Sequence, residues 1–218
     1  MERTDLRYQA YVDILREELI AAMGCTEPIA LAYAAATARE LLGAMPERVR
    51  IQASPSIIKN VKSVIVPNTG GLKGMPAAAA AGIVAGAADK KLEVISQVTP
   101  EQQEEMRACL EQIAFQVEML DTEHDFELLV TLERGEDSVL VHILDHHTNI
   151  VGIEKNGKVL LECQDSGAKK PEHRTDRSLL NMEDIYDFIT TMDPQDVQEI
   201  LDRQIAYNTA IADEGLRN

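Results

Sequence analysis

Cys25 is the residue whose setting in this sequence most favours chemistry. It stands in the run Gly24-Cys25-Thr26-Glu27-Pro28, where a hydroxyl, a carboxylate and a proline together are typical of a helix start. A thiol at a helix N-terminus lies at the positive end of the helix dipole, which favours the thiolate and lowers the pKa. We therefore expect Cys25 to be a proton acceptor, a nucleophile or a metal ligand. The alternative is a small buried apolar side chain.

A glycine-rich loop is the second candidate. Residues 67–74 read Pro-Asn-Thr-Gly-Gly-Leu-Lys-Gly and precede an Ala-rich helix. Glycines before a helix N-terminus let backbone amides approach an anion such as a substrate carboxylate. The loop matches neither the phosphate-binding P-loop nor the dinucleotide fingerprint. The alternative is a turn that only packs the helix closely against a sheet.

Two shorter patterns leave their interpretation open. Ser56 and Lys59 match S-x-x-K, the nucleophile signature of penicillin-recognising enzymes. A strand is predicted there, and the later partner motifs of that signature are missing. Lys59 and Asn60 are therefore candidate polar contacts only.

His146 and His147 are adjacent, and on a strand they would point to opposite faces. One of them could then face a site and the other water, although a loop or hairpin edge accounts for both equally well.

The elements around these residues predict an α+β fold. Apolar spacing predicts helices over 6–23, 27–42, 75–88 and 99–113, of which the first two would form a helical hairpin with Cys25 in its elbow. Strands are predicted over 48–58, 116–120, 127–133, 139–144, 150–154 and 159–162, the last five as an antiparallel meander with turns at 134–137 and 155–158. Residues 164–177 are predicted to be a linker or exposed loop, and 178–213 to be two helices divided near Asp193 and Pro194.

Composition narrows the class of function. The 218 residues include 37 acidic and 21 basic side chains, a net charge of −16, which argues against nucleic acid or an anionic membrane as partner. The longest run of low polarity, 75–88, is too short to span a bilayer, and the N-terminus lacks the pattern of an export signal. The spacing of Cys25, Cys109 and Cys163 predicts neither a disulfide scaffold nor a zinc site, so a cytoplasmic location is expected.

Five segments, taken in order, form a pattern more specific than any one of them. They are residues 24–28, 55–61, 66–70, Gly74 with its Ala-rich helix, and 147–150. This series resembles the L-cysteine desulfidase family, which is related to the iron–sulfur L-serine dehydratases and includes serine dehydratase-like proteins. The similarity runs from Met1 to about Asn218, a span that looks like the N-terminal half of an intact member.

The resemblance implies a lyase that eliminates the β-substituent of L-cysteine or L-serine without pyridoxal phosphate, giving pyruvate and ammonia, with sulfide released from cysteine. It implies a [4Fe-4S] cluster that acts as Lewis acid through one iron free of protein ligands. The cluster cysteines belong to the C-terminal half in that family, so no metal ligand and no cofactor are expected in this chain. Carried over position by position, Cys25 is the proton acceptor. The positions that would contact the substrate are Lys59, Asn60, Asn68, Thr69, Gly70, His147 and Asn149.

These expectations divide the chain into three parts. Residues 1–45 form the helical hairpin that carries Cys25, residues 46–163 an α+β domain resembling the small β-domain of bacterial serine dehydratases, and residues 164–218 a linker and helices that lead to an absent C-terminal catalytic half. The expected partners are a small amino-acid substrate and that half, on the same or a neighbouring chain, with a homodimer left open. The chain alone is expected to be inactive. The alternative function is a non-catalytic module that senses an amino acid or mediates dimerisation.

Overall fold

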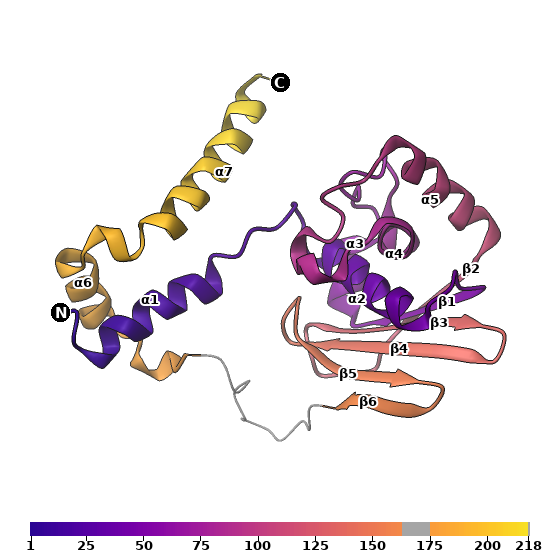
Figure 1. Cartoon of the computed structure of the whole chain (residues 1–218), viewed down its shortest axis with the longest axis horizontal. Helices are drawn as coiled ribbons and strands as arrows, with labels where there is room; N and C mark the ends of the chain where they lie inside the picture. The colour runs from indigo at the N-terminus through magenta and orange to yellow at the C-terminus, as the bar shows by residue number, and fades with distance from the viewer. Residues whose placement is uncertain (163–174, 218) are drawn as a thin grey trace. The chain divides into compact units, whose positions relative to one another are not determined.

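The chain folds into two compact units. The computed structural model describes residues 1–162 and 175–217 (Figure 1). Met1–Ala21 and Asp165–Asn218 make up the smaller unit, and Ala22–Gln164 make up the larger one. Each unit has its own buried apolar cluster. Cys163 and most of the loop predicted over 164–177 lie outside the described residues.

The larger unit is built on a six-stranded sheet in the order β2-β1-β3-β4-β5-β6. The strands are β1 (Arg48–Ala53), β2 (Ala114–Met119), β3 (Glu127–Arg134), β4 (Asp137–Leu144), β5 (Ile150–Lys155) and β6 (Lys158–Glu162). Strands β3 to β6 form the predicted antiparallel meander. Its two tight turns place Gly135 (φ 56°) and Gly157 (φ 74°) in the left-handed region that glycine favours.

The position of β2 differs from the prediction. It does not continue the meander but pairs in parallel with β1 at the edge of the sheet. Parallel neighbours need a long crossover, and the helices between β1 and β2 supply it. Local alternation predicts a strand but not its partner, which is why the sequence pattern placed β2 wrongly.

Helices cover one face of the sheet (Figure 1). They are α2 (Thr26–Leu42), α3 (Pro55–Val61), α4 (Gly74–Ala85), the short 3-10 helix η1 (Ala88–Glu93) and α5 (Pro100–Gln112). Helix α5 begins at the predicted cap, where Thr99 and Gln102 bond each other's backbone amides. The strand predicted over 48–58 ends at Ala53, because Pro55 cannot donate to a sheet and instead begins α3.

Small residues let α2 and α4 approach very closely. A Cβ added at Gly82 would lie only 2.1 Å from the carbonyl oxygen of Ala32. Below these helices, the alternating positions of β1, Val49, Ile51 and Ala53, are buried as a half-buried strand requires. The core of the larger unit therefore lies between the helices and one face of the sheet.

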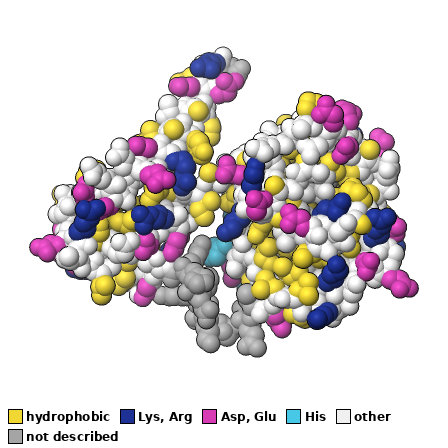
Figure 2. Space-filling model, viewed as in Figure 1, with side chains coloured by type: hydrophobic (Ala, Val, Ile, Leu, Met, Phe, Trp, Pro, Cys, Tyr) yellow, Lys and Arg dark blue, Asp and Glu magenta, His cyan; other side chains and the backbone are white. Residues whose placement is uncertain are grey.

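The smaller unit contains only helices among its described residues. These are α1 (Leu6–Glu18), η2 (Arg177–Leu179), α6 (Met182–Thr191), η3 (Pro194–Asp196) and α7 (Gln198–Arg217). The rings of Tyr8 and Tyr11 pack edge-on against Phe188, with centroids 5.2 and 5.3 Å apart. The predicted division near Asp193 is confirmed, since Asp193 caps η3. Apolar side chains along α7, among them Ile211 at 70% exposure, lie on its surface (Figure 2).

The helical hairpin expected over residues 1–45 is replaced by two helices in different units. Helix α1 ends at Glu18 rather than near Met23, and its tyrosines pack on Phe188, whereas α2 packs on the sheet. The α+β class is confirmed, with helices at the N-terminus, a mostly antiparallel sheet and helices at the C-terminal end. In the described part of the chain, no helix combines the length and the apolar character that crossing a membrane requires.

Candidate functional site

The first turn of α2 presents Cys25 at the surface of the larger unit. Cys25 is the N-cap residue of α2, is exposed and makes no capping bond through its side chain. Gly24 precedes it at φ 127°, a conformation that glycine adopts readily, and a Cβ added there would lie 3.7 Å from Pro67 Cγ. The Cys25 turn and the start of the glycine-rich loop are therefore neighbours.

Glu27 connects Cys25 to α3. The Cys25 thiol donates a hydrogen bond to Glu27 Oε2 at 3.0 Å, and Asn60 Nδ2 donates to Glu27 Oε1 at 3.1 Å. Both carboxylate oxygens are thus held by side chains. The bond from Cys25 is the main cause that lowers the pKa of Glu27 below its ordinary value, and Asn60 and His147 add to it. Glu27 is consequently ionised at neutral pH.

The thiol of Cys25 is harder to ionise than the sequence predicts. Burial raises its pKa above the ordinary value, and the hydrogen bond to Glu27 and the charge of Glu27 raise it further. A backbone amide acts in the opposite direction and is outweighed. The expectation of a thiolate favoured by the helix dipole is therefore wrong for the chain as it stands, because burial of the sulfur and the negative charge of Glu27 beside it both favour the neutral thiol.

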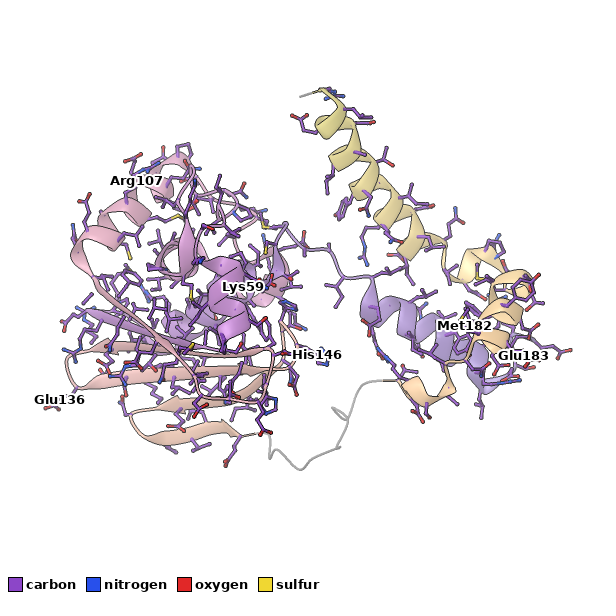
Figure 3. The ribbon with its side chains drawn as sticks, turned by 180° about the vertical axis from the view of Figure 1, so that it is seen from behind. Lys59, Arg107, Glu136, His146, Met182 and Glu183 are labelled. Atoms are coloured by element: carbon purple, nitrogen blue, oxygen red, sulfur yellow. The ribbon has the colours of Figure 1, made fainter. Side chains whose placement is uncertain are left out.

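His147 completes the cluster from the loop between β4 and β5. Its Nε2 lies 2.9 Å from Thr26 Oγ1, and its ring packs against Phe126 with centroids 4.4 Å apart. Burial lowers the pKa of His147, while Glu27 raises it and His146 lowers it. His146 is exposed (Figure 3). The two histidines lie in a loop rather than on a strand, and one of them faces the cluster while the other faces solvent.

The remaining residues of the predicted site near the cluster have different roles. Lys59 is exposed on α3, one residue before Asn60 (Figure 3). Together with Ser56 it lies in a helix and not on the strand that was predicted. Asn149 donates from Nδ2 to the carbonyl oxygen of Leu144 at 2.8 Å, so its amide closes the β4–β5 loop. Lys59 therefore lies on the same helix as Asn60 with its side chain exposed, whereas the Asn149 side chain bonds the backbone of its own loop.

Polar groups of the glycine-rich loop bond within the loop and to the segment just before it. Thr69 is fully buried, donates to the carbonyl oxygen of Val66 at 2.8 Å and accepts from the Leu72 amide at 3.1 Å. The amide of Gly74, at the start of α4, donates to the carbonyl oxygen of Val64 at 3.1 Å. These bonds hold the loop together and occupy the Thr69 hydroxyl and the Gly74 amide.

Asn68 and Gly70 bond residues outside the glycine-rich loop. Asn68 Nδ2 donates to the carbonyl oxygen of Ile95 at 3.0 Å, and the carbonyl of Gly70 accepts from Arg107 Nη2 at 3.2 Å. Arg107 lies on α5, well apart from Lys59 (Figure 3). Hydrogen bonds therefore connect Cys25 and Asn60 through Glu27, and His147 to Thr26. The Asn68 side chain, the Thr69 hydroxyl and the Gly70 carbonyl bond Ile95, the loop itself and Arg107 instead.

Two members of the cluster were missed as functional residues. The sequence pattern explains Glu27 and Thr26 only as parts of a helix start, a first-turn carboxylate and a capping hydroxyl. Both belong to the run that singled out Cys25, and a carboxylate two residues from a candidate base was the available signal. The hydroxyl of Thr26 bonds His147 instead of capping α2.

An iron–sulfur cluster held by this part of the chain would need donor side chains among the described residues. Across residues 1–162 and 175–217, no three His, Cys, Asp or Glu side chains gather as a ligand group. Cys109 is buried in α5, and burial raises its pKa to about 11, which opposes the thiolate that a metal ligand must supply. An iron–sulfur cluster thus does not fit the donor groups of this part of the chain.

Fold and site together define an α+β unit in which a cysteine and a glutamate at a helix N-terminus are backed by an amide and an imidazole. The sequence is 49% identical over 216 residues to a UPF0597 protein of Desulfitobacterium hafniense, a match that covers 99% of this chain and 50% of that protein. UPF0597 proteins of Lachnoclostridium phytofermentans (46% identical, 97% of this chain, 50% of the relative) and Treponema denticola (41% identical, 97% of this chain, 49% of the relative) are also similar. The chain spans about half the length of these relatives. No family model and no solved structure matches it.

Proposed function

We propose that this chain is part of a lyase that eliminates the β-substituent of L-cysteine or L-serine, with Cys25 as the group that accepts the α-proton. One observation carries the proposal. Three segments of the ordered series, 24–28, 55–61 and 147–150, meet around the Glu27 carboxylate and the Thr26 hydroxyl. These segments resemble those of the L-cysteine desulfidases and the related L-serine dehydratases, and their meeting supports a shared site.

The reaction needs a base at the α-carbon and a place for the amino acid. Cys25 as a thiolate takes the α-proton, and the pair of electrons from the broken carbon–hydrogen bond forms the carbon–carbon double bond. The bond to sulfur or oxygen breaks with its electrons on the leaving group. The enamine that remains becomes an imine and is hydrolysed to pyruvate and ammonia. Lys59, exposed beside Asn60, supplies a positive charge for the substrate carboxylate.

The described residues do not gather three Cys, His, Asp or Glu side chains that could hold a cluster. The relatives are about twice as long as this chain, and we propose that the region outside the match completes the site, including any Lewis acid for the leaving group. The substrate carboxylate then needs no contribution from the buried Thr69.

The proposal is tested with a full-length hybrid in which this chain replaces the matched segment of the Desulfitobacterium hafniense relative. The hybrid is supplied with iron and sulfide under anaerobic conditions, and pyruvate and sulfide are measured with L-cysteine and L-serine. We expect release of pyruvate that falls at least about 100-fold in Cys25→Ser, the size of a general base's contribution. Cys109→Ala is the matched control and keeps the activity.

Two results would overturn the proposed lyase function. One is turnover that Cys25→Ser leaves intact, which removes Cys25 from the chemistry. The other is amino-acid binding without turnover that is indifferent to Cys25→Ser, which supports a sensing module instead.

A further inference from the structure

We propose that Glu27 is a positioning residue that keeps Cys25 as a hydrogen-bonded thiol until a primary ammonium group pairs with the Glu27 carboxylate and frees the sulfur to ionise. The inference rests on the proposed function in one respect, that the ammonium belongs to the amino-acid substrate. The site would then hold its base in the protonated form when no substrate is bound. Binding of the substrate would itself produce the base.

The geometry fixes the carboxylate beside the sulfur. Glu27 lies in the first turn of α2 and is half-buried, and its two oxygens accept from Cys25 on one side and from Asn60 on the other. A carboxylate offers about four acceptor positions, so both bonds leave capacity for a further donor. Because Cys25 is exposed, the proton that the thiol loses can pass to solvent.

The charged groups around the pair come from three elements. Glu27 is on α2, Lys59 lies next to Asn60 on α3, and His147 with the exposed His146 lies on the β4–β5 loop. His147 is held through Thr26, and burial lowers its pKa, so the imidazole is mostly neutral at pH 7. The Glu27 charge is therefore the dominant one at hydrogen-bond distance from the sulfur, and it disfavours the thiolate.

An ammonium that pairs with Glu27 reverses this effect. The carboxylate charge is then compensated, and the Coulomb penalty on a neighbouring thiolate is reduced. An amino acid bound in this way also carries its α-carbon next to the ammonium, one bond from the nitrogen. The group that activates the thiol and the proton to be removed then belong to the same molecule.

The experiment follows the alkylation of Cys25 by iodoacetamide in this chain, because only the thiolate reacts. The rate is measured between pH 6 and 11 from the mass of the Cys25 peptide, with the Cys109 peptide as the buried internal reference. We expect Glu27→Gln to lower the midpoint of the profile by about one pH unit and to raise the rate at pH 7.5 about tenfold. Glu101→Gln, a carboxylate on α5 in the same unit, leaves the profile unchanged.

A second set of measurements tests whether an ammonium group that pairs with Glu27 activates Cys25. L-Alanine, which has no β-leaving group, and methylammonium are added to the chain, with acetate as the control anion. Both ammonium compounds are expected to accelerate alkylation of Cys25 in the wild type and not in Glu27→Gln, whereas acetate has no effect. The inference that the substrate triggers ionisation is overturned by either of two results. One is that the ammonium compounds accelerate alkylation equally in the wild type and in Glu27→Gln, and the other is that they accelerate it in neither protein.

If Glu27→Gln does not shift the pH profile of Cys25 alkylation, the positioning role of Glu27 is contradicted. Far-UV circular dichroism establishes that the variant is folded, and Asn60→Leu provides a second test that leaves Glu27 in place. Loss of the Asn60 anchor frees the carboxylate to move, so a smaller shift in the same direction is expected. Alkylation needs no turnover, and its failure is therefore distinct from a failure of the lyase assay with the hybrid.

Discussion

At the scale of single residues, a local charge outweighs the helix dipole. A helix N-terminus acts as roughly half a positive charge and contributes about 0.3–1 kcal/mol at an exposed site. The Glu27 carboxylate carries a full negative charge and lies 3.0 Å from the sulfur of Cys25. Burial of the sulfur is the largest cause that raises the pKa of the thiol, and the hydrogen bond to Glu27 and its nearby charge raise it further.

The negative charge of Glu27 also acts on His147. Burial holds the pKa of His147 below its ordinary value, and Glu27 partly compensates by stabilising the imidazolium. We predict that Glu27→Gln lowers the pKa of His147 further, because the compensating charge is removed. A titration of the imidazole carbon-bound protons by NMR measures it. His142, which is paired with Glu127, serves as the internal control, and an unchanged or raised pKa of His147 would contradict the prediction.

At the scale of elements, the helix layer depends on close approach between α2 and α4. Six of the seven residues from Ala77 to Ile83 are Ala or Gly and are buried, so the helices pack backbone against backbone. This packing places α2, and with it Cys25 and Glu27, firmly on the sheet. The N-terminal turn of α2 therefore has a rigid support, although its side chains lie at the surface.

Substituting one glycine tests this packing. Gly82→Ala places a methyl group 2.1 Å from the Ala32 carbonyl oxygen, which forces the two helices apart. We expect a loss of about 3 kcal/mol in the free energy of unfolding, at the upper end for overpacked cores. Gly215→Ala on the exposed part of α7 meets nothing within 4 Å and is expected to gain about 0.5–1 kcal/mol from helix propensity. Urea unfolding followed by circular dichroism measures both, and equal effects would refute the close approach.

At the scale of the whole molecule, the two units have separate cores and separate stabilising contacts. In the smaller unit, Glu17 at the end of α1 accepts bonds from the Thr175 amide at 2.9 Å and the Thr175 hydroxyl at 2.7 Å, and it pairs with Arg177. Burial opposes ionisation of Glu17, but these bonds outweigh it and lower its pKa to about 2. The carboxylate therefore links α1 to the chain that leads into η2.

This depressed pKa gives the smaller unit a pH dependence. Stability from the Glu17 bonds is fully present above the unfolded pKa near 4.5 and is lost as the pH falls toward about 2. Glu17→Gln is expected to cost about 1–2 kcal/mol at pH 7 and almost nothing at pH 2. Hydrogen exchange of α1 peptides at the two pH values measures the difference. The same loss at both values would show that the charge of Glu17 does not contribute.

The sequence by itself determined the features whose cause is local. The capping box at Thr99, the turn around Gly157, the division at Asp193 and the helix start at Cys25 depend on backbone geometry within four residues, and all lie where predicted. Periodicity likewise fixed the class of the fold. Only the tertiary structure decided the parallel partner of β2, the separation of α1 from α2 and the meeting of Glu27 with Asn60 and Thr26 with His147. These depend on contacts between residues 33 to 121 positions apart, and no pattern within a short window contains the shape that brings them together.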